Sequence, residues 1–510
     1  MSDYADIVPI QFPIAADRQS AKRHYGVHPY FTRRPHNVVR QYILHYSREH
    51  DRVLDPFGGS GVTAVEAYLE NRRAIQNDIN PLANFIAGGI AHLACGSLTT
   101  DKAGLTALGK ACEERLVSLE HATEKELLDV LGHTPLPENI QLPSNSDVAR
   151  YHDLFTPSQL VSLAIIKNEI AKIGDADVRS DLLLAWSATL SKLNKTFIST
   201  EGRAESRGGS SIFSIYRYKV AKEPVQLPAW KTFQERAENV LAAKAEVHRA
   251  IDLKSRTRGW SGSFHAYALD VEELSQQLAN SVDYIFTDPP YGGHISYLDL
   301  STLWNNWLGL LPSLAVREQE IIVGGELKLN EKHYVDGLSR SIRACVRMLK
   351  QGRWLSVVFQ HWSLSYFEAI LSAATEEGAE LKAAVSQIGD PIWSMHKKKN
   401  GGTVLAGEFI LTFYKSGLHR EATRTGPFDV YEALRKILTE EAGQTMYSEA
   451  VFNKLVIAAW ENSALQSLNI SKSEFITVIE SHGWNYDVAN HCWTKTRVPE
   501  RSLFTHAEMA

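Results

Sequence analysis

Short apolar runs and amphipathic segments alternate near the start of the chain. Residues 51 to 90 read as a strand, a glycine-rich turn, a helix and a second strand, in the order RVLDP, FGGSG, VTAVEAYLEN and RRAIQNDIN. Alternation of short apolar strands with helices is typical of parallel β-α-β units. The pattern therefore predicts the beginning of a parallel α/β sheet.

The pattern changes between about residues 101 and 254, where apolar residues recur at helical spacing over long segments. The clearest of these segments are SQLVSLAIIKNEIAKIG, SDLLLAWSATLSKL and WKTFQERAENVLAAKAEVHRAI. The strand pattern returns at FHAYALDVEEL and VDYIFTDPP and continues to EFILTFYKS. One α/β sheet is thus predicted to be split by a mainly helical insertion.

The chain changes character again after Lys415. SGLHREATRTGP reads as a linker, and SMHKKKNGG, before the last strand, reads as a basic turn. The small piece from residue 428 contains SKSEFITVIESHGW followed by WTKTR. This pattern fits a winged-helix-like reader of DNA, and it fits a helical cap on the edge of the sheet equally well.

The formal net charge of −5 gives no global indication of a nucleic-acid partner. Residues 192 to 222 hold seven Lys or Arg against two Glu, with aromatic residues between them, which suits either a polyanion or a solvated loop. The four cysteines lack CxxC spacing, so we expect neither a disulfide framework nor a metal site. No bilayer-spanning run or secretion signal is evident, which predicts a cytoplasmic protein without a membrane partner.

The turn from Asp55 to Gly61, DPFGGSG, lies between an apolar strand and a helix. Its glycines let a ligand approach the backbone, and the helix N-terminus offers free N–H groups. The glycine spacings of dinucleotide and triphosphate sites are missing, and Asp55 would repel a phosphate. Asp78 ends the next strand, where an acid can accept hydrogen bonds from a ribose. S-adenosylmethionine, a nucleoside with a cationic tail, fits these features.

The second motif is Asp288-Pro289-Pro290-Tyr291, which directly follows an apolar run. Its prolines lack N–H groups and fix φ, so the motif can neither extend a sheet nor begin an ordinary helical turn. The Asp288 carboxylate and the Pro289 carbonyl are two rigid acceptors for the hydrogens of an exocyclic amine. Tyr291 offers a ring on which a planar base can stack. The motif predicts a site that positions an amine for methyl transfer.

Together DPFGGSG and DPPY resemble the FxGxG and catalytic motifs of the DNA amino-methyltransferases. These enzymes methylate N6 of adenine or N4 of cytosine with S-adenosylmethionine. The resemblance covers about residues 25 to 90 and 260 to 415, and it implies a Rossmann-like class I methyltransferase sheet. The insertion before the catalytic motif departs from the usual arrangement of the family.

The resemblance implies roles for individual residues. The catalytic residues would be Asp288, Pro289, Pro290 and Tyr291. The cofactor-binding residues would be Asp55, Phe57, Gly58, Gly59, Gly61, Asp78 and Asp270, with His28, Pro29 and Tyr30 lining the methionine end of the cofactor. His28 can instead be a structural histidine with satisfied hydrogen bonds.

On this interpretation residues 1–100 and 255–418 are the cofactor-binding and catalytic halves of the methyltransferase core. Residues 101–254 form the helical insertion, a candidate for target recognition, and 428–510 form a small C-terminal domain. These domain boundaries follow the changes in pattern described above.

The expected function is site-specific methylation of DNA on a flipped base, because a base inside a duplex cannot reach the DPPY corner. Asp288 favours adenine, since serine is commoner at that position in the cytosine enzymes of the family. A methyltransferase of RNA bases, of the tRNA guanosine-N2 type, and a non-catalytic nucleic-acid-binding subunit are the alternatives. DNA is the expected partner, with a restriction or defence subunit as a further candidate; the oligomeric state is left open.

Overall fold

The computed structural model describes residues 3–17, 22–198, 208–293, 295–387, 408–418, 428–440, 445–462, 464–465, 470–487 and 492–495. The basic turn SMHKKKNGG and most of the predicted linker lie outside these ranges. None of the helices in the described ranges combines the length and apolar character that crossing a bilayer requires.

In the described part of the chain a seven-stranded sheet forms the centre of the molecule, in the order β5-β2-β1-β6-β7-β9-β8. Its strands are β1 (Arg52–Asp55), β2 (Arg73–Asn77), β5 (Ser263–Tyr267), β6 (Val282–Thr287), β7 (Leu349–Phe359), β8 (Ala379–Gln387) and β9 (Glu408–Lys415). β9 runs antiparallel to both β7 and β8, and the remaining pairs are parallel. The predicted Rossmann-like methyltransferase sheet is confirmed.

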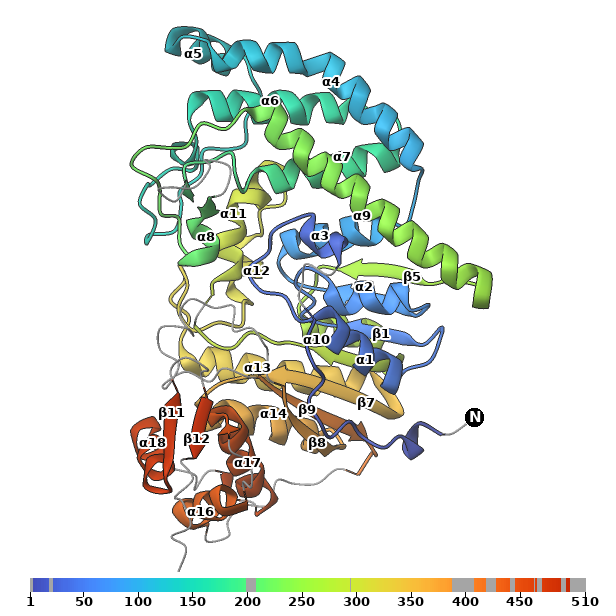
Figure 1. Ribbon diagram of the computed structural model, residues 1–510, viewed down its shortest axis with the longest axis vertical. Coiled ribbons are helices and arrows are strands. Elements are labelled where there is room, and N and C mark those ends of the chain that lie inside the picture. The colour runs from blue at the N-terminus through green and yellow to red at the C-terminus, as the bar shows by residue number, and fades with distance from the viewer. Residues whose placement is uncertain are drawn as a thin grey trace, which may run out of the picture.

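Helices pack against both faces of this sheet (Figure 1). They are α1 (His36–Tyr46), α2 (Val62–Leu69), α3 (Pro81–His92), α10 (Val271–Leu278), α13 (Glu331–Met348) and α14 (Leu364–Glu376). Alternate residues of β6 enter different apolar clusters: Tyr284 and Phe286 pack in one, and Ile285 packs in the other. A strand buried on both faces explains the continuous apolar run before DPPY.

The two sequence motifs meet where the strand order reverses. β1 lies between β2 and β6, and it ends at Asp55 while β6 ends at Thr287. Ligands of open parallel sheets bind outside the carboxyl ends of the strands at this point. The sheet order thus brings the glycine-rich turn and DPPY to one crevice.

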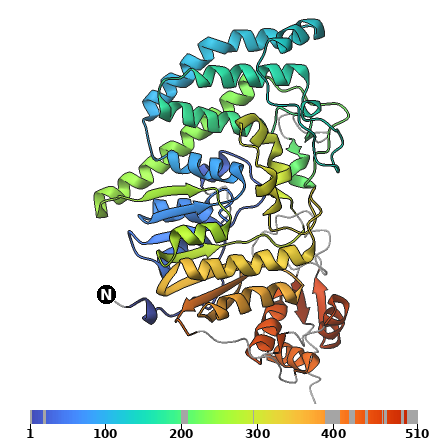
Figure 2. The ribbon, with the colours of Figure 1, turned by 180° about the vertical axis from the view of Figure 1, so that it is seen from behind.

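The predicted helical insertion is confirmed, since the chain leaves the sheet after α3 and returns to it at β5. The inserted elements are α4 (Leu98–Glu120), α5 (Glu124–Gly132), α6 (Pro157–Ala171), α7 (Ala176–Thr189), β3 (Phe197–Ile198), β4 (Gly209–Ser210), α8 (Ser211–Ser214) and α9 (Ala229–Arg258). They form one end of the elongated molecule, beyond β5 (Figures 1 and 2). Because β5 is an edge strand, the insertion does not interrupt the hydrogen bonds between neighbouring strands of the sheet.

The helix that follows DPPY, α11 (Tyr297–Leu308), is anchored by the insertion. The Tyr218 hydroxyl donates to the Leu300 carbonyl at 2.7 Å, and the Tyr151 hydroxyl donates to the Leu303 carbonyl at 2.6 Å. α12 (Leu314–Glu318) comes next along the chain, and short 3-10 turns lie at Tyr4–Asp6, Arg23–Gly26 and Tyr151–Leu154. The insertion therefore fixes the segment that covers the crevice.

A buried charge cluster joins three inserted helices. Lys244 of α9 is fully buried and ion-pairs with Asp101 of α4 at 2.6 Å and Asp181 of α7 at 2.7 Å. Lys244→Met is expected to lower the free energy of unfolding by roughly 3–5 kcal/mol, because it leaves two buried carboxylates without a counter-charge. Urea unfolding measures this loss. As a control, Arg343→Met removes a more exposed pair with Glu376 and is expected to cost at most about 1 kcal/mol; equal losses would contradict the prediction.

The C-terminal piece packs on the other end of the sheet (Figure 1). Its elements are α16 (Val430–Glu440), β10 (Thr445–Met446), α17 (Ser448–Glu461), α18 (Lys472–Ser481), β11 (Trp484–Asp487) and β12 (Cys492–Lys495), with the strands in the order β10-β12-β11. The Trp362 ring contacts the rings of Phe452 and Phe475, with centroids 4.7 and 5.6 Å away. The piece thus has winged-helix-like element order and also docks on the domain that contains the seven-stranded sheet.

Candidate active site

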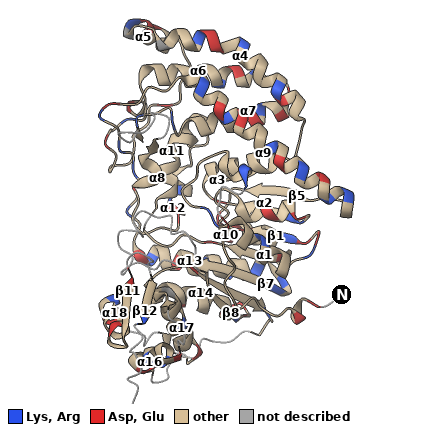
Figure 3. Cartoon of the chain, viewed as in Figure 1, with Lys and Arg blue, Asp and Glu red and all other residues tan. Residues whose placement is uncertain are grey.

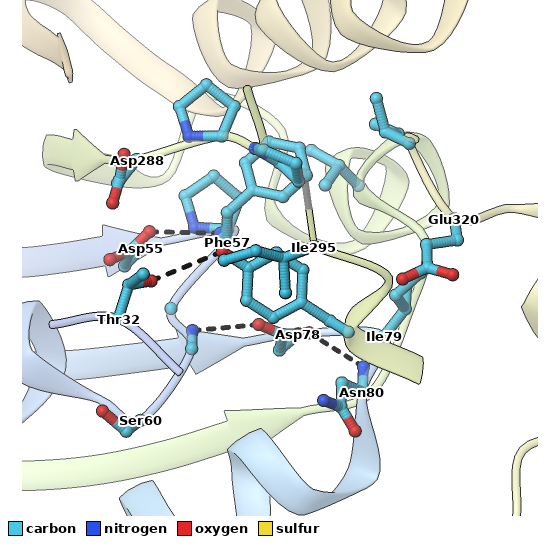
Figure 4. Close-up of a pocket in the computed structure, with 18 of the residues that line it drawn as sticks. Thr32, Asp55, Phe57, Ser60, Asp78, Ile79, Asn80, Asp288, Ile295 and Glu320 are labelled. Carbon is cyan, nitrogen blue, oxygen red and sulfur yellow. Dashed lines mark hydrogen bonds between the residues drawn. The ribbon is translucent and has the colours of Figure 1, made fainter. Parts of the chain in front are cut away.

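A cavity runs along the carboxyl ends of β1, β2 and β6 and joins the glycine-rich turn to DPPY (Figure 4). Of the residues expected from the sequence, it is lined by Tyr30, Asp55, Phe57, Gly58, Gly59, Asp78, Asp270, Asp288, Pro289, Pro290 and Tyr291. Asp288 and Asp55 lie at one side of the cavity, and Asp78 lies at its floor in the view of Figure 4. The fold therefore collects residues from distant parts of the chain around one space.

His28 and Pro29, which were expected to line the cavity, are not part of its lining. His28 is buried, its Nδ1 lies 2.7 Å from the Pro29 carbonyl, and its Nε2 lies 3.0 Å from the Ser187 hydroxyl. Since a carbonyl only accepts, Nδ1 donates to it, and Nε2 accepts from the serine. Burial lowers the His28 pKa to about 3, so the ring is neutral. Because α7 of the insertion supplies Ser187, these contacts favour the structural alternative for His28.

Gly61 also lies outside the lining, and its place in the structure indicates a packing role. It is the N-cap of α2 with φ of 89°, and a Cβ there would lie 2.5 Å from the Cβ of Ala87 on α3. Both the left-handed backbone and the close approach of two helices require glycine. Helix packing therefore accounts for a glycine at this position, and the expected contact of Gly61 with a cofactor stays a prediction.

Substitution of Gly61 is expected to act on stability. Gly61→Ala should lower the free energy of unfolding by about 1–3 kcal/mol, since the new methyl group meets α3 and φ is unfavourable. The matched control is Gly88→Ala on α3, where a Cβ meets nothing within 4 Å. That change should be neutral or stabilise the helix by up to about 1 kcal/mol. Chemical denaturation of both variants checks the difference, and equal effects would contradict it.

The glycine-rich turn is held against the end of β2. The Gly59 N–H donates to Asp78 Oδ2 at 2.9 Å, and the Asn80 N–H donates to Asp78 Oδ1 at 2.8 Å. Gln76 donates to the Gly59 carbonyl at 3.1 Å, and a Cβ on Gly58 would lie 2.1 Å from the Gln76 side chain. Burial raises the Asp78 pKa to about 6. The backbone of the turn therefore lies close to the cavity, beside the Asp78 carboxylate, which can accept further hydrogen bonds.

Asp55 connects the turn to β6. Its Oδ1 accepts from the Phe57 N–H at 3.1 Å and from the Thr287 hydroxyl at 2.8 Å, so it links the ends of β1 and β6. Burial raises the Asp55 pKa to about 7, and the hydrogen bonds only partly offset this effect. A cation bound beside Asp55 would favour the ionised carboxylate.

The DPPY corner is rigid in the structure as well as in its sequence. The Tyr291 hydroxyl donates to Asp288 Oδ1 at 2.6 Å, and the Tyr334 hydroxyl donates to the Pro290 carbonyl at 2.5 Å. The Tyr291 ring stands edge-on to Phe359, with centroids 5.3 Å apart. Each of these contacts limits the movement of the corner relative to the sheet.

Arg34 is a site residue that sequence reasoning missed. Its guanidinium donates to both oxygens of Asp288, from Nε at 2.5 Å and from Nη2 at 2.9 Å. Nη2 also donates to the Tyr291 hydroxyl at 2.5 Å, and Nη1 ion-pairs with Glu408 at the start of β9. Arg34 stands 254 residues before Asp288, and nothing in the sequence TRRPHN points to this pairing.

Glu320 is a second site residue that was missed. It lines the cavity on the side opposite Asp288 in Figure 4, and its carboxylate accepts from the Leu298 N–H at 3.1 Å. This bond caps the N-terminus of α11. Burial raises the Glu320 pKa to about 8. No local sequence signal marks it, because its burial depends on how the chain folds back after α12.

The ionisable lining of the cavity favours a cationic ligand. Besides tyrosines, the ionisable groups among the described residues of the lining are the carboxylic acids Asp55, Asp78, Asp270, Asp288 and Glu320 and the guanidiniums of Arg33 and Arg34. Arg33 donates to the Ser60 hydroxyl and the His28 carbonyl, at 2.8 and 2.6 Å. Burial raises three of the acid pKa values, so these carboxyls are partly protonated in the empty cavity, and a bound cation would favour their ionised forms. Because the lining has more acids than cations, it is better suited to a cation than to a phosphate.

The strand order and the cavity at its switch point define the chain as a protein with the Rossmann-like fold of methyltransferases. Comparison with known proteins narrows this class. A family model described as DNA methylase, N6_N4_Mtase, matches residues 11–84, which include the glycine-rich turn and Asp78.

The Type II methyltransferase M.MvaI of Kocuria varians is 22% identical over 265 residues, which make up 51% of this chain and 51% of that protein. The chain thus spans about half the length of the curated relative it matches. The family match and this relative confirm the predicted resemblance to the DNA amino-methyltransferases.

A solved structure titled as the antibiotic-resistance methyltransferase Kmr is 16% identical and covers 34% of this chain and 72% of its own, with a TM-score of 0.18. At that TM-score the likeness adds nothing to the assignment of the fold, which rests on the sheet order above.

Proposed function

We propose that the protein transfers a methyl group from S-adenosylmethionine to the exocyclic amine of a flipped base in DNA, with N6 of adenine favoured over N4 of cytosine. The observation that supports this most strongly is the single cavity that connects Asp78 and the glycine-rich turn with the Asp288 carboxylate. A nucleoside site and an amine-acceptor site in one cavity are what such a transfer requires.

The cavity residues fit S-adenosylmethionine. Asp78 would accept hydrogen bonds from the ribose, the backbone of Gly58 and Gly59 would lie along the ligand, and Asp55 would lie near its ammonium group. Phe57 and Ile79 supply apolar surface for the adenine ring. When bound, this cofactor supplies an electrophilic methyl group on a positively charged sulfur.

The chain itself would position the amine. Asp288 and the Pro289 carbonyl would accept the two amine hydrogens, and this would direct the nitrogen lone pair toward the cavity. Tyr291 would stack on the base, and the Asp288 carboxylate would accept the proton that the amine loses. These contributions are positioning and preorganised electrostatics, which require no covalent intermediate.

The proposed function also requires basic residues that contact DNA phosphates, and the helical insertion supplies candidates. Basic and acidic residues are interspersed along α4, α7 and α9 (Figure 3). Within residues 192–222, of which 199–207 lie outside the described ranges, Lys192 ion-pairs with Glu235 and Arg217 with Asp147. These two basic residues are therefore compensated internally, which favours a solvated loop at their positions over a polyanion site. Target recognition by the insertion or by the C-terminal piece remains part of the proposal.

The test uses the full chain with S-adenosylmethionine that carries a deuterated methyl group, and unmethylated DNA of mixed sequence. After digestion to nucleosides, mass spectrometry is expected to find labelled N6-methyldeoxyadenosine. Labelled N4-methyldeoxycytidine would overturn the preference for adenine. Parallel samples contain RNA or protein extract in place of DNA. Label in RNA or protein and none in DNA would overturn the proposal. The absence of label from all three samples would also overturn it.

A further inference from the structure

Arg34 lies beside the Asp288 carboxylate, where the target amine would bind in the proposed reaction. Its Nε and Nη2 groups present two N–H donors to the two oxygens of Asp288. An exocyclic amine would present its N–H donors to the same carboxylate. Since the carboxylate is held at the end of a rigid corner, the guanidinium and the amine compete for it.

Arg34 also lies at the hydroxyl end of the Tyr291 ring. Its Cζ lies 5.5 Å from the centroid of the Tyr291 ring, in a cation–π arrangement, and its Nη2 donates to the Tyr291 hydroxyl. The guanidinium therefore contacts both residues of the corner that were expected to hold the base. The side chain is only 16% exposed, so solvent does not compete strongly with these contacts.

Glu408 gives Arg34 a second partner away from DPPY. It begins β9, the antiparallel strand, and its carboxylate ion-pairs with Nη1 of Arg34, the nitrogen that does not contact Asp288. If Arg34 left Asp288, its charge would still be paired with Glu408. The cost of removing a buried guanidinium from one carboxylate falls when another carboxylate retains it.

We propose that Arg34 is a placeholder for the target base: it holds the Asp288 acceptors and the Tyr291 hydroxyl, and the incoming base must displace it while Glu408 retains its charge. This inference rests on the proposed function, because it takes Asp288 as the acceptor of the target amine. Arg34 then acts as a specificity-determining residue. Only DNA whose binding free energy exceeds the cost of displacing Arg34 reaches the methyl donor.

The test measures the initial rate of methyl transfer from labelled S-adenosylmethionine to limiting unmethylated DNA of mixed sequence. Arg34→Ala is expected to raise this rate roughly tenfold, since a charge-assisted contact no longer competes with the base. Millimolar ethylguanidinium should refill the space and lower the rate of the variant toward the wild-type value, whereas ethylammonium at the same concentration should not. Wild type should respond to neither compound.

Two further variants distinguish this role from a structural one. Glu408→Gln removes the second partner, so displacement becomes harder and the rate should fall several-fold, opposite to Arg34→Ala. Arg72→Ala removes a buried arginine that donates to the Ser47 carbonyl and hydroxyl, outside the cavity, and should lower stability without raising the rate. If Arg34→Ala does not fold, Arg34→Lys replaces it, with a smaller rise expected because lysine lacks the two-pronged donor geometry.

The placeholder role would be overturned if the folded Arg34 variant transferred methyl groups more slowly than wild type, whether or not ethylguanidinium restored the rate. A fall in the rate of both Arg34→Ala and Glu408→Gln would overturn it as well. Failure of the proposed function looks different: wild type would then transfer no label to DNA, or Asp288→Ala would transfer label as fast as wild type. In either of those cases the wild-type and Asp288 measurements reveal the failure independently of Arg34.

Discussion

Asp288→Ala is expected to lower the rate of methyl transfer to DNA by about 100- to 1,000-fold, the size of effect seen when one preorganised electrostatic partner is removed from a reacting group. The variant loses the acceptor that orients the amine and takes its proton. Affinity for S-adenosylmethionine should change by less than about threefold, because the substitution leaves in place the groups that hold the cofactor residues. Asp78 still holds Gly59, and the Phe57 N–H and the Thr287 hydroxyl still hold Asp55.

The measurement combines single-turnover transfer of label to DNA with calorimetric titration of the cofactor. Asp283→Asn is the control, because Asp283 lies on β6, the strand that DPPY follows, and pairs with Lys350 and Arg353 outside the cavity. Its side chain is 5% exposed, against 23% for Asp288. It should lose stability and keep its transfer rate. A transfer rate in Asp288→Ala within tenfold of wild type would exclude Asp288 as the main acceptor of the amine.

The double variant Arg34→Ala/Asp288→Ala separates the two roles at the corner. Loss of Asp288 alone leaves the Arg34 guanidinium with Glu408 as its described carboxylate partner and so adds a cost in stability. Removal of both residues should recover part of that stability and none of the activity. Recovery of activity would mean that the charge of Arg34, and not the loss of the acceptor, stops the reaction.

The centre of the fold could be predicted because its signals are local. The strands that end at Asp55 and Thr287 are short apolar runs, and each is followed by residues that cannot extend a strand. Once both strands are assigned to one parallel sheet, their carboxyl ends must lie at the same edge. The meeting of DPFGGSG and DPPY therefore follows from the sequence with few additional assumptions.

The parts of the site that were missed depend on long-range contacts. Arg34 and Glu320 acquire their places through partners distant in sequence, and arginine or glutamate in a loop is more often exposed. His28 was assigned to the cavity from its local resemblance to a family segment, but the insertion brings Ser187 to its ring. A sequence motif of the core cannot predict which of its residues will contact an inserted domain.

Binding of S-adenosylmethionine is expected to tighten by roughly five- to tenfold as pH rises from about 6 to about 7.5. Burial raises the Asp55 pKa to about 7, so at the lower pH this carboxyl is mostly neutral and offers little attraction to the ligand's cationic tail. At the higher pH it is mostly ionised. Burial also raises the Asp78 pKa to about 6, so its contribution is nearly complete by the middle of the range. Titration calorimetry across the range measures the slope.

The unliganded protein should respond to pH in the opposite direction. An acid whose pKa is raised on folding binds more protons in the native state than in the unfolded state, so its contribution to stability falls as pH rises from about 4 to about 7. Asp55→Asn should remove most of the slope in cofactor affinity and weaken the decline in stability. 5′-Methylthioadenosine, which lacks both cationic groups, should bind wild type with only the weaker dependence due to Asp78. Equal slopes for the two ligands would show that Asp55 does not contact the cationic tail, and would move the ammonium site to another carboxylate of the cavity.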